Sequence, residues 1–422
     1  MRIRSATIRS ISMDDMRVAF FGDMNNNFFS FMRHLRDLGL DAHLFLYKMQ
    51  DTNQPRWAPT SDTYEWDKWA PYVHHTPMRC HWRELLGGRF GRLRKQLRDF
   101  DILFASGFAA ALLARAGMRP DFFMPYSIGF EIIKNRPRRG LRYFSDTLLR
   151  SFQLKGVKSA RRIVLMTGDY QTGQVARELG LPAREYTTIP MVYAPLTELP
   201  DTAIPDPTVD HVLSRLTCAD FVVSSHVRHD WINYDGTYPG SFNIRYSKRT
   251  DILLRGFAKF VARSASACAR LLLCDYGADV SHSKELIDQL GITSHVVWSP
   301  ELKRRQIMRL IPRADVCAGE FMDACLTGGV VLESMAAGKP LLNALTISSD
   351  EYRRRSGSPI PPVIACNSVD DVVRNLLDLE ANPSKRMRIG QAGRDWFDMF
   401  AGRGLAETFV RDFHELIQTK AR

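Results

Sequence analysis

The stretch that decides the fold is Thr327-Gly-Gly-Val-Val-Leu-Glu-Ser-Met-Ala-Ala-Gly-Lys-Pro340. Two glycines, Gly328 and Gly329, stand where a helix would begin, and the carboxylate of Glu333 follows on that helix. The free N–H groups of a helix N-terminus point outward, and glycine lets a phosphate approach the backbone closely. The carboxylate can accept hydrogen bonds from sugar hydroxyls, so the stretch favours a nucleotide-sugar site. An ordinary buried amphipathic helix explains the same residues equally well.

The length of the chain, 422 residues, predicts two domains, because one ordinary core rarely grows that large. Residues 1–15 lack the apolar region of a secretory signal, so we expect a leader there and the start of the fold at Met16. No run of about 18 apolar residues is present, and no membrane span is predicted. The seven cysteines lack the spacing of a disulfide framework or a zinc site, which favours a reducing cytoplasm.

Both halves of the chain alternate apolar strands with amphipathic helices. The first unit is a strand over 16–21, a turn rich in Gly and Asn, a helix over 28–38 and a strand over 41–46. A second series begins at Phe221, after a segment rich in Pro, Asp and Thr. Strand–helix–strand units imply parallel sheets with right-handed crossovers. We therefore predict an α/β fold with two domains and a cleft between them.

The formal net charge of +12 is unevenly distributed. Basic runs lie at 89–98, 134–142 and 155–162, and they would suit the phosphates of nucleic acid, of anionic lipid or of an acidic substrate. A solvated basic surface is the simpler interpretation of each run taken singly. Nucleic-acid binding rests on the charge alone, since the chain lacks interleaved aromatic residues and any known reading motif.

Several segments of the C-terminal half resemble, in the same order, GT-B glycosyltransferases of the retaining group 1, called family 4. They are the stretch quoted above and the segments Lys248–Phe257, Leu271–Gly277 and Ala314–Val316. The resemblance is strong from Val222 to Ala344 and looser in the N-terminal half. It implies two Rossmann-like domains that face each other across a cleft, with C-terminal helices that cross back to the first domain. The expected divisions are a leader (1–15), an acceptor domain (16–200), a linker (201–218), a donor-binding domain (219–395) and a returning helix (396–422).

This resemblance implies a retaining glycosyltransferase that moves a sugar from a nucleoside diphosphate sugar to a glycan or lipid-linked acceptor. Two cations, Arg228 and Lys248, would face the donor diphosphate, and Glu320 would contact the sugar. Fixed cations stabilise the charge that develops on a departing diphosphate, so we expect neither a metal ion nor a cofactor. The remaining donor-side residues would be Gly328, Gly329, Glu333, Trp298 and Asp275.

The acceptor side is expected in the N-terminal half. Asn25 and Asn26 lie in the turn after the first strand, where ligands bind in open α/β sheets, although a helix cap explains them equally well. Gly129 and Glu131 occupy the place of a His-Gly-x-Asp motif found in many relatives. An anionic membrane that carries a lipid-linked acceptor is a further expected partner, at the inner face of the plasma membrane.

Three departures from the family pattern are present. Cys325 stands in place of the first of two glutamates, and Ile128 in place of the usual histidine. An insertion over 229–246 separates Arg228 from Lys248 and makes Arg245 and Arg249 alternatives to Arg228. The first two departures motivate a second hypothesis, a degenerate GT-B protein that binds a nucleotide sugar or glycan without turnover.

Overall fold

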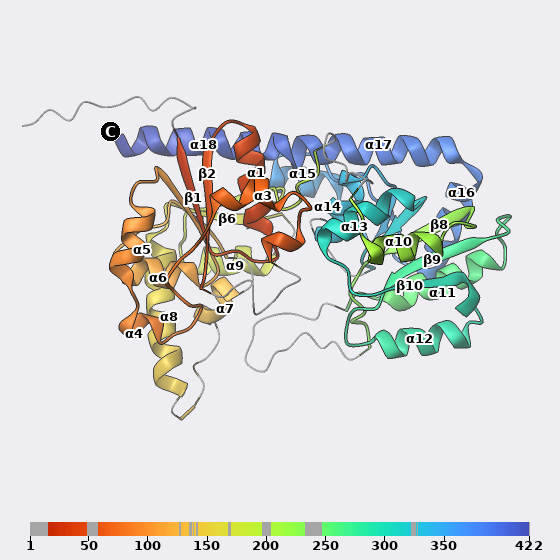
Figure 1. The fold of residues 1–422 in the computed structure, drawn as a ribbon, viewed down its shortest axis with the longest axis horizontal. Helices are drawn as coiled ribbons and strands as arrows, with labels where there is room; N and C mark the ends of the chain where they lie inside the picture. Colours follow the sequence, from red (N-terminus) through yellow and green to blue (C-terminus); the bar gives the residue numbers. More distant parts are fainter. Residues whose placement is uncertain are drawn as a thin grey trace, which may run out of the picture.

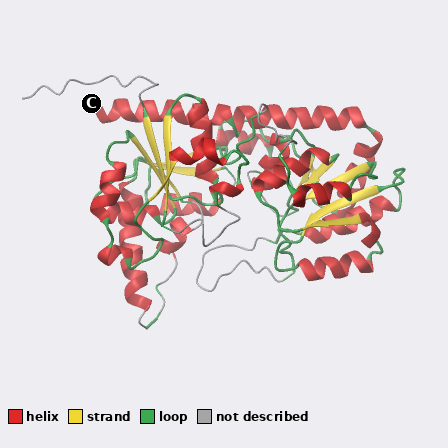
Figure 2. Ribbon diagram, viewed as in Figure 1, coloured by secondary structure: helices red, strands yellow, loops and turns green. Residues whose placement is uncertain are grey.

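The computed structural model describes residues 16–48, 58–125, 128–134, 137, 139–140, 142–167, 170–195, 204–232, 247–321, 326 and 328–421. Two α/β domains lie side by side, and a pair of long C-terminal helices runs along both of them (Figure 1). Helices cover the faces of both sheets (Figure 2). Among the described helices, none has the length and apolar character that a bilayer crossing needs.

The N-terminal domain is built on a seven-stranded parallel sheet of order β3-β2-β1-β4-β5-β6-β7. Its strands are β1 (Arg17–Phe21), β2 (Asp41–Leu46), β3 (Val73–His75), β4 (Ile102–Ser106), β5 (Phe122–Met124), β6 (Arg162–Met166) and β7 (Ala183–Tyr186). The helices are α1 (Asn27–Asp37), α3 (Trp66–Trp69), α4 (Glu84–Gly87), α5 (Phe90–Leu97), α6 (Ala109–Arg115), α7 (Ile128–Lys134), α8 (Arg142–Ser159) and α9 (Tyr170–Glu178), with short 3₁₀ turns at Pro59–Ser61 and Ala70–Tyr72. Neighbouring residues of β1 fill the cores on opposite faces, Phe20 on one and Phe21 on the other. Burial on both faces explains the nearly continuous apolar sequence of this strand.

The C-terminal domain has a six-stranded parallel sheet of order β10-β9-β8-β11-β12-β13. Its strands are β8 (Phe221–Ser225), β9 (Ala269–Cys274), β10 (Val296–Ser299), β11 (Val316–Ala318), β12 (Leu341–Asn343) and β13 (Ile364–Ala365). The helices are α10 (Pro207–Ser214), α11 (Thr250–Val261), α12 (Val280–Gln289), α13 (Arg304–Leu310), α14 (Gly329–Ala336), α15 (Ser349–Ser356) and α16 (Val369–Ala381), with 3₁₀ turns at Thr293–His295 and Ile311–Arg313. Helix α10 lies inside the segment expected to be a linker, and it packs against α13 and β10.

In each sheet, the strand that comes first in the sequence lies inside the sheet, and later strands are added on both of its sides. Strand β1 lies between β2 and β4, and β8 lies between β9 and β11. In open parallel sheets, ligands bind in the crevice outside the carboxyl ends of the strands at such a point. The turn over 22–27 follows β1, and the loop over 226–230 follows β8, so these two segments are where a ligand site is expected.

Helices α17 (Pro383–Phe400) and α18 (Arg403–Ala421) tie the two domains together. Helix α17 packs against α14 of the second domain, and α18 packs against α1 of the first (Figure 1). The ring centroid of Phe409 lies 4.9 Å from that of Phe31 and 4.4 Å from that of Tyr186. The last helix of the chain therefore completes the core of the N-terminal domain.

Candidate functional site

The loop after β8 brings two predicted cations together. The Lys248 backbone N–H donates to the Asp230 carbonyl over 2.8 Å, and the Arg228 guanidinium pairs with the Asp230 carboxylate. The ends of the insertion therefore meet, although Arg245 and the rest of 233–246 lie outside the described residues. Arg249, the other alternative, pairs instead with Asp251, with Nε 3.0 Å from Oδ1. Arg228 and Lys248 thus both contact Asp230, whereas the Arg249 side chain contacts Asp251.

Lys248 also contacts the acid predicted on the sugar side. Its Nζ lies 2.5 Å from Oε1 of Glu320, which follows β11 and is only 9 % exposed. The backbone N–H of Glu320 donates to Oδ1 of Asn343 over 2.8 Å, and this bond fixes the loop. The second carboxylate oxygen, Oε2, is buried without a hydrogen-bond partner among the described residues. Leaving such an acceptor unsatisfied costs about 1–3 kcal/mol, so this oxygen is suited to accept a ligand hydroxyl.

Helix α14 begins at the two glycines predicted to contact the donor. Gly328 is the N-cap residue, and no side chain of the described residues caps the helix. A Cβ added at Gly329 would lie 3.6 Å from the nearest described atom, Oε1 of Glu333, which is an ordinary contact. Packing therefore does not demand glycine at position 329, and close approach of a ligand remains a reason for it.

Glu333 is buried and already holds two partners. Its Oε2 accepts from Nε2 of His226 over 2.7 Å, and its Oε1 accepts from Nε of Arg304 over 2.8 Å. Burial alone would raise the pKa of this carboxyl, but the His226 hydrogen bond and the Arg304 charge outweigh it and lower the pKa to about 2. Glu333 is therefore ionised at neutral pH.

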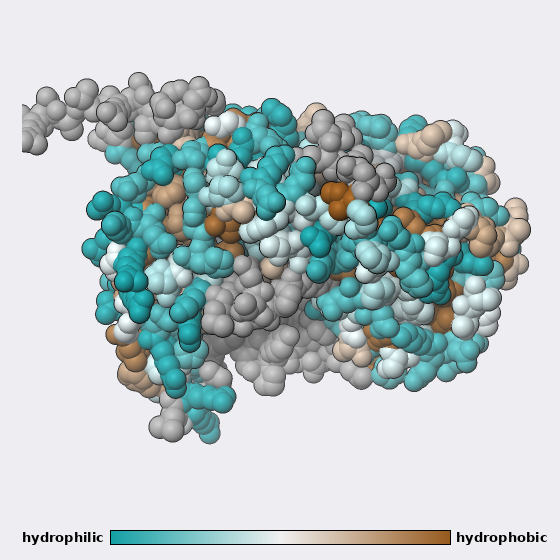
Figure 3. Space-filling model, viewed as in Figure 1, coloured by the Kyte–Doolittle hydropathy of each residue, from teal (hydrophilic) through white to brown (hydrophobic). Residues whose placement is uncertain are grey.

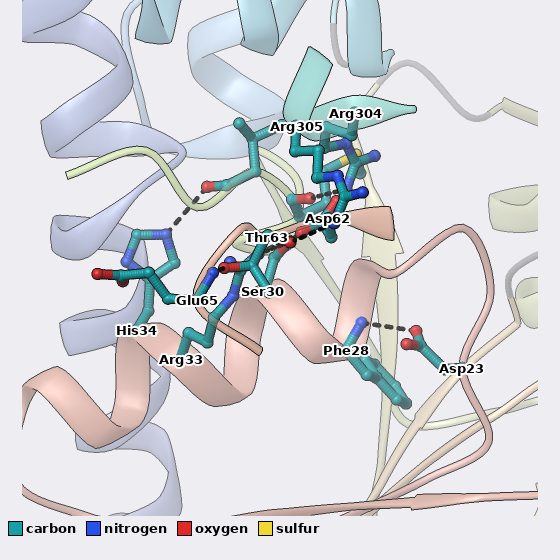
Figure 4. A network of polar contacts seen from close by, with 12 residues as sticks. Asp23, Phe28, Ser30, Arg33, His34, Asp62, Thr63, Glu65, Arg304 and Arg305 are labelled. Carbon is teal, nitrogen blue, oxygen red and sulfur yellow. Dashed lines mark hydrogen bonds and ion pairs between the residues drawn. The ribbon is translucent and has the colours of Figure 1, made fainter. Parts of the chain in front are cut away.

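Arg304 extends this contact into the N-terminal domain (Figure 4). Its Nη1 donates to Oδ1 of Asp62 over 3.1 Å and to the Met191 carbonyl over 3.0 Å. Asp62 also pairs with Arg33 and accepts from the Ser30 hydroxyl, both on α1. A chain of buried charges thus runs from α14 across the interface to α1.

The sequence did not identify His226 or Arg304 as site residues. His226 directly follows β8, at the point where the strand order reverses, and that position was the available signal. Arg304 opens α13, and nothing in its local sequence separates it from its neighbours Lys303 and Arg305.

Asp275 and Trp298 both contact Lys284, near the loop over 226–230 that follows β8. Nζ of Lys284 lies 2.8 Å from Oδ2 of Asp275 and 5.1 Å from the ring centroid of Trp298. The Trp298 ring is 5.3 Å from that of His229. Gly277 has φ +125°, and a Cβ there would lie 2.5 Å from the His229 backbone. Glycine is therefore required where the loops after β8 and β9 cross.

The turn after β1 holds Asn25 and Asn26 in the left-handed region, at φ 54° and 59°. Asn26 is the N-cap residue of α1, yet its side chain makes no capping bond. Instead Oδ1 of Asp23 accepts from the Phe28 N–H over 2.9 Å, and burial raises the pKa of Asp23 to about 7. Oδ1 of Asn26 and Nδ2 of Asn27 are buried with no described hydrogen-bond partner. Asp23 therefore caps α1, and the side-chain amides of Asn26 and Asn27 remain suited to contact a ligand.

Gly129 and Glu131 lie in the first turn of α7, at the carboxyl end of β5. The Gly129 carbonyl accepts from Nε2 of Gln153 over 3.0 Å, and an added Cβ would lie 3.2 Å from the Phe123 ring. Close packing therefore explains this glycine. Glu131 is half-buried. Ile128 begins the same helix, and Cys325 lies outside the described residues.

Comparison with known proteins identifies the fold. Residues 241–396 match the family model described as glycosyl transferases group 1, and no curated protein matches the chain. HepE from Anabaena in complex with UDP is 13% identical with a TM-score of 0.58, over 94% of this chain and 99% of HepE. Sucrose-phosphate synthase from Thermosynechococcus elongatus is 12% identical with a TM-score of 0.56, over 96% and 100%. UDP-GlcNAc 2-epimerase from Neisseria meningitidis, bound to UDP-GlcNAc, is 10% identical with a TM-score of 0.52, over 94% and 99%. The expected GT-B fold is thereby confirmed.

Proposed function

We propose that this chain, which has the GT-B fold and whose residues 241–396 match the glycosyl transferases group 1 family, is a retaining glycosyltransferase. It would move a sugar from a nucleoside diphosphate donor to a glycan or lipid-linked acceptor, in the synthesis of a surface polysaccharide, lipopolysaccharide or glycolipid. HepE was solved with UDP and glucose, which makes UDP-sugars the first donors to test. The fold also occurs in an epimerase, so the proposal rests on the site as well as on the fold.

The observation that carries the proposal is the pair Lys248–Glu320 at the carboxyl ends of β8 and β11. Both residues lie inside the matched segment. Lys248 and Arg228 would stabilise the negative charge of the departing diphosphate, together with the N–H groups that open α14. Oε2 of Glu320 would accept a hydroxyl of the transferred sugar.

Proton transfer in this proposal needs no side-chain base. In a front-face reaction the sugar–phosphate bond breaks and the acceptor oxygen bonds to the same face of the sugar. The departing diphosphate takes the acceptor proton. The protein then contributes positioning and charge stabilisation, which lower the barrier without a covalent intermediate.

Glu333 would hold the ribose of the nucleotide while keeping its present partners. Each carboxylate oxygen accepts one hydrogen bond, from His226 or from Arg304, and a carboxylate offers about four lone-pair directions. One ribose hydroxyl could therefore bind without displacing either partner. The low pKa keeps the acceptor form present throughout the neutral range.

A non-catalytic GT-B protein remains the second candidate. Cys325 favours it, because a thiol cannot replace a carboxylate in binding sugar hydroxyls. Glu320, five residues upstream, is the acid that would take over this role in the first proposal. Both candidates would bind the donor, but only the glycosyltransferase would turn it over.

A peripheral membrane contact is part of the first proposal. Leu86 on α4 and Tyr143 and Phe144 on α8 are large apolar residues that are 56–62% exposed. Figure 3 shows an apolar patch at the lower left corner, where Figure 1 places α4, within a mostly hydrophilic face. Apolar residues beside cations can enter the headgroup region of an anionic bilayer. Sedimentation with anionic vesicles and not with neutral ones would support this contact, and equal sedimentation would oppose it.

The test of the proposed function combines donor binding with turnover. Thermal shift against UDP-, GDP- and ADP-sugars identifies the donor, because a ligand of the native state raises the Tm. Hydrolysis of that donor is then compared for the wild type, Lys248→Ala and Glu320→Gln. Lys259→Ala is the matched control, since Lys259 lies on α11 and pairs with the exposed Asp370 over 3.1 Å.

We expect Lys248→Ala to lose donor binding and Glu320→Gln to keep binding but lose turnover, while the control behaves as the wild type. Donor binding by the wild type with negligible turnover in every protein would favour the degenerate binder. Absence of any Tm shift across the panel would reject both candidates.

A further inference from the structure

A strongly basic hollow lies on the N-terminal domain, apart from the candidate site described above. It is a cavity of about 890 Å³ between the segments that follow β2 and β3 and the helices α4 and α5. Five of its lining residues are cations, Lys48, Arg79, Arg89, Arg92 and Lys95. Glu84 is the single carboxylate among the lining residues.

The cations of the hollow are not used by the fold. None of the five forms an ion pair or a side-chain hydrogen bond with another described residue. The same basic run also contains cations that are used. Arg94 donates from Nε to the Ala116 carbonyl over 3.1 Å, and Nε of Arg98 lies 3.4 Å from Oδ1 of Asp99. Contacts within the protein therefore account for Arg94 and Arg98. They do not account for the cations of the same run that line the hollow.

The positive charges around one hollow repel each other, and an anion relieves that repulsion. Arginine presents a planar fork of donors that fits phosphate in a bidentate manner, and lysine adds a compact charge. A volume of about 890 Å³ is at the upper end of ordinary ligand pockets, roughly 300–1,000 Å³. The hollow thus has room for a diphosphate and part of the group attached to it.

The position of the hollow assigns it to the acceptor side. Strands β1, β2 and β3 are parallel neighbours, and their carboxyl ends share one edge of the sheet. The hollow begins beyond β2 and β3, roughly 10 Å from the turn after β1 at a strand spacing of about 4.8 Å. The donor-side cations Arg228 and Lys248 belong to the other domain. An anion in the hollow is therefore a group other than the donor diphosphate.

We propose that this hollow binds a phosphate or diphosphate group of the acceptor. The inference that the bound group belongs to an acceptor rests on the proposed glycosyltransferase function, whereas anion binding itself does not. The group could belong to a lipid-linked glycan or to a water-soluble glycan phosphate, and both present the same charge to the five cations.

The first measurement is titration of the full chain with inorganic pyrophosphate at physiological ionic strength. The hollow variant is Arg92→Gln combined with Lys95→Gln, and the matched control is Arg98→Gln on the same segment. Loss of charge-assisted hydrogen bonds should weaken binding roughly tenfold or more in the hollow variant. The control should bind as the wild type.

Pyrophosphate could also bind at the donor cations, so Lys248→Ala is titrated in parallel. Retained affinity in Lys248→Ala assigns the binding to the hollow. Loss of affinity in Lys248→Ala, equal weakening in the control, or no binding by the wild type would each overturn the proposal. Melting temperatures of all variants show whether they fold.

Competition then distinguishes the two sources of phosphate. Farnesyl diphosphate represents a lipid diphosphate, and glucose 1-phosphate represents a water-soluble glycan phosphate. Displacement of pyrophosphate by either supports the proposal and names the source, and displacement by neither overturns it. If the donor panel fails while binding in the hollow persists, the proposed function falls and the anion site stands.

Discussion

Arg304 neutralises two buried carboxylates from different domains. Asp62 and Glu333 have side chains that are 1% and 6% exposed, and Arg304 contacts both. Without Arg304 the two carboxylates would keep Arg33 and His226 respectively, but each would lose a buried, charged hydrogen-bond partner. Such bonds contribute about 1.5–3 kcal/mol each, more than a surface ion pair does. The contribution of this residue to stability should therefore greatly exceed that of its neighbours.

We predict that Arg304→Ala lowers the free energy of unfolding by about 3–5 kcal/mol. Arg305→Ala is the control, because the Arg305 Nη1 donates to the backbone carbonyls of Thr60 and Thr63, each over 3.0 Å, and no carboxylate is left unpaired. Urea unfolding of the two variants measures the difference. A loss of similar size in both would show that Arg33 and His226 are enough to hold the two carboxylates.

His34 makes the stability depend on pH. Its Nε2 donates to the Val192 carbonyl over 3.0 Å, and burial lowers its pKa from 6.5 to about 4. Between these values the unfolded chain binds a proton that the native state refuses, so stability rises with pH from about 4 to 6.5. The full effect is at most about 3 kcal/mol. Asp23, with its raised pKa, acts in the opposite direction over nearly the same range.

Comparing the wild type with His34→Gln isolates the histidine from Asp23. We predict that the variant loses part of the decline in stability between pH 6.5 and pH 4, since glutamine can donate to Val192 but does not titrate. Urea unfolding at several pH values gives both curves. Parallel curves would contradict the assignment.

At the scale of elements, helix α17 crosses the C-terminal end of α14 at two glycines. They are Gly390 on α17 and Gly338 just after α14. A Cβ on Gly390 would lie 2.0 Å from the Gly338 carbonyl oxygen, and backbone atoms cannot move aside as a flexible side chain does. Helix α14 carries Glu333, so this contact also fixes the helix that we propose binds the donor.

We predict that Gly390→Ala destabilises the protein by about 2 kcal/mol, because a clash with backbone places overpacking near the upper end of its usual cost of about 1–3 kcal/mol. The better helix propensity of alanine, about 1 kcal/mol, offsets only part of that cost. Gln391→Ala, at the next and exposed position, should change stability by a few tenths at most. Thermal melting separates the two, and an unchanged Tm for Gly390→Ala would show that α17 can shift.

Strands and helices with strong periodicity were predictable, including the order of β1, α1 and β2. The linker over 201–218 stays a prediction, and the structure adds a helix within it, α10. Asp206 caps this helix and Pro207 is its first residue, a frequent helix start that the sequence analysis did not use. Strand β13 is confined to Ile364–Ala365, and Pro361 and Pro362 before it cannot donate to a sheet ladder.

The site was predictable to the extent that its residues follow strands. Lys248 and Glu320 were predicted as site residues from the family pattern, and the structure adds that they contact each other. The interface contact of Arg304 with Asp62 joins residues that are 242 positions apart, and no local pattern reports such a contact. In the sequence the basic hollow likewise appears only as a run of basic residues. The fold decides which of those cations form ion pairs and which can bind an anion.

At the scale of the whole molecule, the last helix is part of the first domain. Phe409 packs on Phe31 and Tyr186, and its ring centroid lies 6.0 Å from that of Phe104 on β4. Asp412 on the same helix accepts from the Tyr186 hydroxyl over 2.7 Å. Stability of the N-terminal sheet is therefore coupled to the C-terminal end of the chain.

We predict that Phe409→Ala costs about 3–5 kcal/mol, as for a buried phenylalanine elsewhere. Its effect should appear in the N-terminal sheet, as faster hydrogen exchange of β1 and β4. Met399→Ala is the control, since Met399 is 62% exposed. Exchange that accelerates only within α18 would show that this helix is docked without being part of the core.

Helix α18 also has a consequence for synthesis of the protein. The ribosome makes Phe409 and Phe413 about 300 residues after β4, so the N-terminal sheet is synthesised long before the residues that complete its core. During that interval its apolar face is exposed to chaperones and proteases. A chain truncated shortly before α18 would contain every described strand and still could not bury its first sheet.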